Sequence, residues 1–209
     1  MKIKNLAATR RIDRLAFLLW TIIVAGCADS SGTSDVPLES SLQQSAVSPA
    51  EVSVEIKSWQ EVQDWVATQR GKVVVIDVWS TFCLTCMQEF PHFLELQQEY
   101  GADVACASLS VDFYGGTGNQ PEDVKLQVLK FLKSQQATTR NFISSDPDTY
   151  VLKQIKTVAI PAALVYDKSG HLNRVFNNEQ EEFGPTGFQY EQDITPLVEQ
   201  LIAATPSKK

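Results

Sequence analysis

Two cysteines, Cys83 and Cys86, stand three positions apart, shortly after a run of apolar residues at positions 73–79. This run predicts a buried strand whose carboxyl end brings both thiols to the first turn of a helix. Thiols at this spacing can close a short disulfide, and the amide groups and dipole of the helix stabilise a thiolate on the first cysteine. The first sulfur then faces solvent, and the second lies behind it. The pattern predicts a redox-active dithiol with Cys83 as the nucleophile and Cys86 as the resolving thiol.

A structural disulfide, or one half of a zinc site, would also contain such a cysteine pair. Zinc needs further ligands, and the remaining candidates, Cys106, His92 and His171, show no paired spacing. No bound metal is therefore expected. Cys106 lies in an apolar stretch and is expected to be a core residue, and we expect no role for the two histidines.

The elements that must position these thiols follow from the apolar periodicity of the chain. The patterns predict an α/β domain over residues 51–205, in which a central mixed β-sheet is covered by helices on both faces. Strands are expected at 52–56, 73–79, 104–111, 162–166 and 172–176. Helices are expected after the capping box Ser58–Glu61, from Cys83 to about Gly101, from Pro121 onward and over about 190–204. A further strand and short helix are expected within 139–157.

Two distant segments resemble thioredoxin-like proteins. Residues 79–91, with the sequence WSTFCLTCMQEFP, are similar to the active-site segment of the TlpA/ResA branch, whose members are membrane-tethered, extracytoplasmic thiol–disulfide oxidoreductases. Residues 158–170 resemble the cis-proline loop, strand and hairpin turn of the same family. The resemblance covers roughly residues 52–204. It implies a thioredoxin fold with a TlpA/ResA-like insertion and a redox-active disulfide between Cys83 and Cys86.

Three residues of the active-site segment depart from the family pattern. Leu84 and Thr85 stand between the cysteines, where the family often has proline before the second cysteine, and Phe82 replaces a common tryptophan. These differences alter the redox potential in a direction that the sequence leaves open.

Two acids compete for the role of proton carrier to the second cysteine. Asp77 lies within the apolar strand, and the resemblance places it where thioredoxins have their buried acid; burial would raise its pKa. Glu89 follows the second cysteine by three residues, where the TlpA/ResA branch often has a glutamate. A strand-end aspartate and a solvated helix carboxylate are the plain alternatives, and the choice stays open.

Pro161 and three apolar residues complete the expected site. The resemblance implies that Pro161 follows a cis peptide bond, lies against the disulfide and exposes the backbone of Ile160. Trp79, Phe82 and Ile160 are expected to form an apolar rim on which a partner peptide rests. Ordinary packing of these three side chains is the alternative.

The first part of the chain has the layout of a bacterial lipoprotein. Basic residues precede an apolar run of eleven residues, 15–25, which is too short to span a bilayer. Residues 24–27, VAGC, resemble a lipobox, which implies removal of residues 1–26 and lipidation of Cys27. Ordinary signal cleavage with Cys27 as a spare thiol is the alternative. Residues 28–50 contain seven serines and two prolines and are expected, with Cys27, to form a flexible tether.

The charge of the mature chain excludes one class of partner. Residues 1–26 contain five Lys and Arg and one Asp, so the remaining chain has 13 basic and 24 acidic residues and a net charge near −11. Such a surface repels phosphate backbones and anionic headgroups. We therefore expect no binding of nucleic acid, and we expect attachment to the membrane through the lipid.

The resemblance implies an extracytoplasmic enzyme that reduces disulfides of partner proteins without a cofactor other than its own disulfide. Apocytochrome c is one such partner, and a membrane thiol reductant would supply the electrons. The direction of electron flow, the physiological partner, the membrane leaflet and the oligomeric state stay open.

Three other functions compete with this prediction. A peroxiredoxin-like peroxidase would have threonine three residues before Cys83, where Ser80 stands, and a proline that is missing. A Cu(I)-binding, metallochaperone-like protein would use the same two thiols, although such proteins usually add a late histidine and have a wider cysteine gap. A non-catalytic binding module would keep only the fold.

Overall fold

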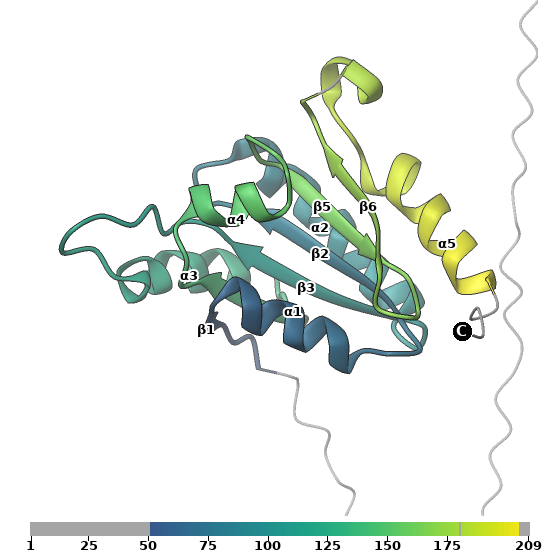
Figure 1. Ribbon diagram of the computed structural model, residues 1–209, viewed down its shortest axis with the longest axis horizontal. Coiled ribbons are helices and arrows are strands. Elements are labelled where there is room, and N and C mark those ends of the chain that lie inside the picture. Colours follow the sequence, from purple (N-terminus) through teal and green to yellow (C-terminus); the bar gives the residue numbers. More distant parts are fainter. Residues whose placement is uncertain (1–50, 180, 205–209) are drawn as a thin grey trace, which may run out of the picture. The chain divides into compact units, whose positions relative to one another are not determined.

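A six-stranded mixed sheet forms the centre of the domain (Figure 1). The computed structural model describes residues 51–179 and 181–204, so the expected signal segment, the tether and Cys27 lie outside the described residues. The strands are β1 (Glu55–Lys57), β2 (Val73–Trp79), β3 (Val104–Ser110), β4 (Arg140–Ser144), β5 (Ala162–Tyr166) and β6 (Leu172–Asn177). Their order in the sheet is β1–β4–β3–β2–β5–β6; the first four run parallel to one another, and β5 and β6 are antiparallel to their neighbours.

Helices cover both faces of this sheet, as the sequence predicted. They are α1 (Trp59–Thr68), α2 (Leu84–Tyr100), α3 (Lys125–Ser134), α4 (Asp148–Gln154) and α5 (Thr195–Ala203). Short turns precede α3 and α5: the 3₁₀ segments η1 (Pro121–Val124) and η2 (Glu181–Thr186), and the π-helical turn η3 (Tyr190–Ile194). Within the described residues, no helix combines the length and the apolar character needed to cross a membrane.

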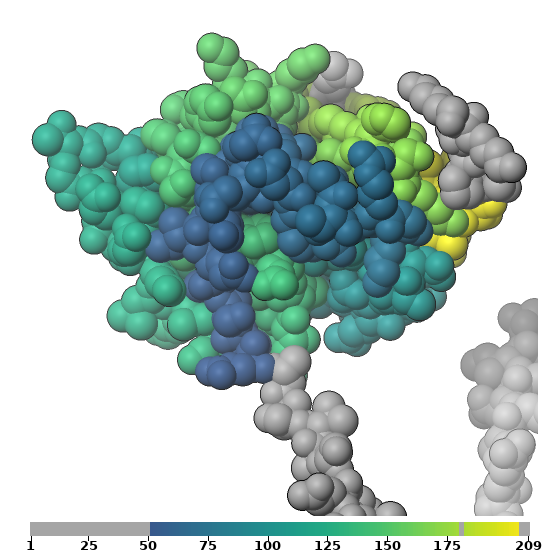
Figure 2. Space-filling view, turned by 60° about the horizontal axis from the view of Figure 1, so that its bottom comes forward, coloured from purple at the N-terminus to yellow at the C-terminus, as the bar shows by residue number. Residues whose placement is uncertain are grey.

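The alternation of side chains along β2 divides the core into two layers. Val73, Val75 and Trp79 belong to the layer formed with α2, α3 and α5. Val74, Ile76 and Val78 belong to the layer formed with α1 and α4. Figure 2 shows α1, in blue, spread across its side of the domain. Because β2 is buried along its whole length, its sequence is a continuous apolar run interrupted by a single acid.

The carboxyl end of β2 leads into the start of α2, and this connection holds the cysteine pair. Strand β2 is paired on both sides, with β3 in parallel and β5 in antiparallel register. Its position in the middle of the sheet gives the segment that follows it a rigid support. Ser58 and Glu61 form the expected capping box at the start of α1.

Two elements differ in detail from the prediction, and a third takes a place in the sheet that the sequence patterns did not specify. Strand β1 begins at Glu55, three residues later than expected, and among the strands of the described residues it pairs only with β4. Strand β4, expected as an added strand, lies between β1 and β3. The last helical segment begins with the π-helical turn η3, so that α5 itself begins at Thr195.

Candidate functional site

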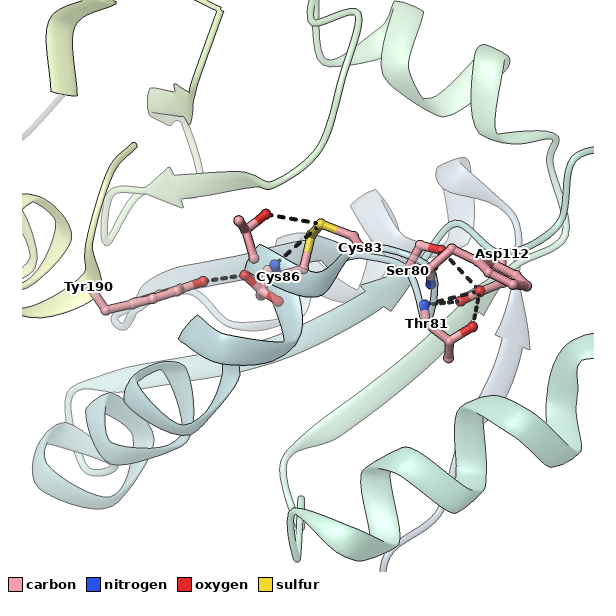
Figure 3. Close-up of a disulfide and its surroundings, with 9 residues drawn as sticks. Ser80, Thr81, Cys83, Cys86, Asp112 and Tyr190 are labelled. Carbon is pink, nitrogen blue, oxygen red and sulfur yellow. Dashed lines mark hydrogen bonds between the residues drawn. A yellow bond between two sulfur atoms is a disulfide. The ribbon is translucent and has the colours of Figure 1, made fainter. Parts of the chain in front are cut away.

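Cys83 and Cys86 form a disulfide at the start of α2, with an S–S distance of 2.00 Å. Cys83 is the N-cap of the helix, and its Sγ accepts a hydrogen bond of 3.2 Å from the backbone N–H of Cys86. The Cys86 side chain is 2% exposed, whereas Cys83 is partly exposed. The predicted asymmetry between an accessible first cysteine and a covered second cysteine is therefore present. Figure 3 shows the disulfide between them.

A threonine between the cysteines adds a second donor to the first sulfur. The Thr85 hydroxyl lies 3.5 Å from Cys83 Sγ. In the reduced protein this hydroxyl can donate to a Cys83 thiolate, together with the N–H of Cys86 and the helix dipole. The departure from the family pattern at position 85 therefore favours the thiolate.

A buried aspartate that the sequence did not single out fixes the segment before Cys83. Asp112 is 2% exposed and follows the end of β3. Its carboxyl oxygens accept hydrogen bonds from Ser80 Oγ at 3.0 Å, from Thr81 N at 3.1 and 3.2 Å, from Thr81 Oγ1 at 2.5 Å and from Ser110 Oγ at 2.6 Å. Figure 3 shows Ser80 and Thr81 directed toward Asp112 on one side of the disulfide. Asp112 therefore holds in place the turn that delivers Cys83.

Asp77 is buried beneath the site, as predicted, with 4% of its surface exposed. The pKa of Asp77 is raised from 3.8 to about 7: burial raises it most, a hydrogen bond from Tyr190 lowers it in part, and the negative charge of Glu89 adds to the rise. Tyr190 Oη donates to Asp77 Oδ1 at 2.5 Å. The other oxygen, Oδ2, is buried and has no hydrogen-bond partner among the described residues. A pKa near 7 suits the predicted role of Asp77 as a proton carrier, which stays a prediction.

Glu89 lies one helical turn after Cys86 and is partly buried. Its Oε2 is buried without a hydrogen-bond partner in the described part of the chain. Glu89 lines a small cavity of about 80 Å³ together with His92, Gln189 and Glu191. The structure thus places one acid in the core and the other at the edge of a small cavity, and the choice between them stays a prediction.

Pro161 follows a cis peptide bond from Ile160, as the resemblance implied. Ile160 and Cys83 line the same groove, which has a volume of about 400 Å³ and includes Phe82, Tyr114 and Val158. Phe82 is 71% exposed, and its ring centroid lies 6.4 Å from that of Tyr114. These side chains form an apolar surface beside the first sulfur.

Trp79 does not belong to this surface, contrary to one of our expectations. Its side chain is 0% exposed, and its ring packs against Phe90 at 5.2 Å and against Phe131 at 4.7 Å between centroids. It is a core residue, because α2 and α3 both cover the end of β2 where it stands. Of the three expected rim residues, Phe82 and Ile160 line the groove.

Among the described residues, one further cysteine and two histidines do not line the groove beside Cys83. Cys106 is a buried free thiol in β3, and burial raises its pKa far above the ordinary value. Within the described residues, the one group of side chains spaced to share a metal ion consists of His92, Glu95 and Glu191, and it contains neither redox cysteine. His171 lies in the turn after β5, close to Asp167.

Sequence patterns missed Asp112, Tyr114 and Tyr190. Asp112 had a usable signal, because it follows a strand parallel to β2, and the carboxyl ends of parallel strands meet at one edge of a sheet. Tyr114, in the loop after β3, and Tyr190, in the turn before α5, carry no such signal, since their places depend on long-range packing.

Comparisons with solved structures identify the fold. A DsbF homologue from Corynebacterium diphtheriae is 19% identical, with 65% of this chain and 76% of that chain covered and a TM-score of 0.50. The exposed lipoprotein thioredoxin of Streptococcus pneumoniae is 20% identical, covers 65% and 90% of the two chains, and has a TM-score of 0.49. A thiol:disulfide interchange protein of the thioredoxin family from Chlorobium tepidum is 17% identical, covers 65% and 83%, and has a TM-score of 0.47.

Neither protein-family models nor curated proteins match this chain. At these identities the structural similarity establishes the fold alone. The similarity to the DsbF homologue agrees with the six-stranded mixed sheet and its covering helices. The domain has a thioredoxin fold.

Proposed function

We propose that the protein is a thiol–disulfide oxidoreductase that reduces disulfides of partner proteins. One observation carries this proposal: a partly exposed Cys83 caps α2 beside an open apolar groove, and its partner Cys86 is buried behind it. A structural disulfide gains nothing from this asymmetry, whereas exchange requires an accessible attacking thiol and a protected resolving thiol.

The chemistry begins with the reduced protein. The Cys83 thiolate attacks one sulfur of a partner disulfide, forms a mixed disulfide and releases the other partner sulfur as a thiolate. Cys86 then loses its proton and attacks Cys83 Sγ, which closes the disulfide seen in the structure and releases the second partner thiolate. Two electrons pass to the partner, and the released thiolates take up protons according to their pKa values. A thiol reductant must then reduce the protein again.

The site of action follows from the lipobox-like residues 24–27. The proposal is a lipid-anchored protein on the extracytoplasmic side of a bacterial membrane, with a membrane thiol reductant as electron donor and apocytochrome c as one partner. Cys27→Ser should abolish acylation and release the protein from membranes, as fractionation and intact mass would show. An unmodified amino terminus elsewhere in the chain would refute the anchor while leaving the redox proposal intact.

Reduction of a disulfide-bonded test protein such as insulin, with dithiothreitol as electron source, tests the activity. Cys83→Ser should abolish catalysis, and Cys86→Ser should accumulate mixed disulfides with the test protein. Cys106→Ala is the cysteine control, because this thiol is buried in β3 and does not line the groove beside Cys83, so the variant should still reduce insulin. Catalysis that survives Cys83→Ser would refute the proposal, as would stoichiometric Cu(I) on a purified protein that reduces no disulfide.

A further inference from the structure

Tyr190 is buried in the core layer that also contains Cys86. It opens the π-helical turn η3, and its side chain is 1% exposed. Its ring packs against Phe93 of α2 at 5.8 Å and against Phe188 at 6.3 Å between centroids. Contacts on both sides therefore fix the direction of its hydroxyl independently of any hydrogen bond.

That hydroxyl is directed at the acid of the site. Tyr190 Oη donates to Asp77 Oδ1 at 2.5 Å, and both groups are buried. Alternation along β2 places Asp77 on the same face as Val75 and Trp79, which share a core layer with Cys86 and Tyr190. Figure 3 shows Tyr190 and Asp112 on opposite sides of the disulfide. With Oδ1 occupied, Oδ2 is the oxygen without a partner among the described residues.

Burial and the charge of Glu89 oppose the ionisation of Asp77. The neighbours that interact with its charge are Glu89 on α2, Cys106 on β3 and Tyr190. Burial and Glu89 raise the pKa of Asp77, and the hydrogen bond from Tyr190 lowers it. Burial and the charge of Asp77 in turn raise the pKa of Tyr190 well above its usual value, so the phenol stays protonated and stays a donor.

We propose that Tyr190 is a positioning residue for the resolving step: its hydroxyl fixes Oδ1 of Asp77 and leaves Oδ2 free to accept the proton that Cys86 releases. This inference rests on the proposed exchange reaction. When Cys86 attacks the mixed disulfide, its proton passes to Asp77 Oδ2, the Cys86–Cys83 bond forms and the partner sulfur leaves with the electron pair. Without the hydroxyl, the carboxyl would hold its proton more tightly and accept a new one less often.

Tyr190→Phe tests this role, because it removes the oxygen and keeps the ring that fills the space between Phe93 and Phe188. A hydrogen bond to a charged group stabilises it strongly, so we expect the acid dissociation constant of Asp77 to fall by about tenfold or more. The first readout is the carboxyl signal of ¹³C-labelled aspartate in the oxidised protein as a function of pH. The second is the pH–rate profile of insulin reduction. The rise in rate that follows ionisation of Asp77 should move to higher pH, so exchange at pH 7 should become slower.

Two further variants make the result specific. Tyr100→Phe removes a hydroxyl that donates to Glu199 Oε1 at 2.7 Å on the surface, and it should leave both readouts unchanged. In an Asp77→Asn background, Tyr190→Phe should no longer shift the pH–rate profile, because the acid on which it acts is gone.

The outcomes separate this inference from the proposed function. A wild-type protein that reduces no disulfide refutes the proposed function, and the carboxyl titration then still measures the effect of Tyr190 on Asp77. An active wild type whose Asp77 titration and pH–rate profile are both unchanged by Tyr190→Phe overturns the inference. A shift of equal size in the Asp77→Asn background overturns it as well, because Tyr190 would then act on another group.

Discussion

Replacing Asp77 with asparagine tests whether ionisation of the buried carboxyl lowers the free energy of unfolding. Burial raises the pKa of Asp77 from 3.8 to about 7 in the folded protein. The folded state therefore binds the proton more tightly than the unfolded state does. The contribution of Asp77 to stability is fully present below about pH 4 and is lost progressively as the pH rises through 7.

The size of this loss follows from the two pKa values. A rise from 3.8 to about 7 corresponds to about 4 kcal/mol of unfolding free energy once the carboxyl is ionised in both states. Asparagine keeps an oxygen that can accept from Tyr190 and carries no charge. Relative to Asp77→Asn, the wild type should thus lose about 4 kcal/mol between pH 3.5 and pH 8.

The assay is urea unfolding of the oxidised wild type and variant at several pH values, followed by tryptophan fluorescence. Subtracting the two free energies at each pH removes the contributions of groups that titrate alike in both proteins. Asp64→Asn, on the exposed face of α1, is the matched control and should stay within about 0.5 kcal/mol of the wild type. A difference between wild type and Asp77→Asn that is the same at pH 3.5 and pH 8 would refute the reasoning, because the carboxyl would then not ionise with a raised pKa.

Three further substitutions test other parts of the site. Asp112→Asn replaces a carboxylate oxygen that accepts from Thr81 N, so it should lower the free energy of unfolding in urea by about 1–3 kcal/mol. The turn before Cys83 should also exchange its amide hydrogens faster. Unchanged stability and unchanged exchange would contradict the role of Asp112. Thr85→Val removes a donor to the Cys83 thiolate and should slow alkylation of that thiol at pH 7 roughly threefold, whereas an equal rate would show that the hydroxyl has no effect. Glu89→Gln removes a negative charge near Asp77, so the rise in rate that follows ionisation of Asp77 should move to lower pH. Complete loss of that rise would show that Glu89, and not Asp77, carries the proton.

Much of the fold could be predicted because its signals are local. The apolar run of β2, the capping box of α1, and the cysteine pair at the start of α2 each depend on residues close together in sequence. The position of β4 in the sheet, between β1 and β3, could not be predicted from such local patterns. It depends on pairing between strands more than 80 positions apart, as in the register of Glu55 with Phe142, and local patterns carry no information on such pairing.

The expectation for Trp79 failed for a related reason. A tryptophan next to a redox cysteine pair can lie on the surface or in the core, and residue type does not decide between them. The rings of Phe90 on α2 and Phe131 on α3 pack against the indole of Trp79, and this packing places Trp79 in the core. The exposed aromatic surface is instead formed by Phe82 and Tyr114, two residues brought together by the ends of neighbouring parallel strands.

The acid of the site shows where prediction from sequence ends. A single aspartate in an apolar strand was enough to predict burial and a raised pKa, because desolvation depends mainly on the strand itself. How far the pKa rises depends on partners from other elements, and Tyr190, which opposes the rise, is separated from Asp77 by 113 positions. Burial without that hydroxyl would raise the pKa of Asp77 further, and a carboxyl without burial would have too low a pKa to accept a proton near neutral pH. The turn before α5 thus supplies the hydrogen bond that keeps the carboxyl between these two limits, where it can both accept and release a proton near neutral pH.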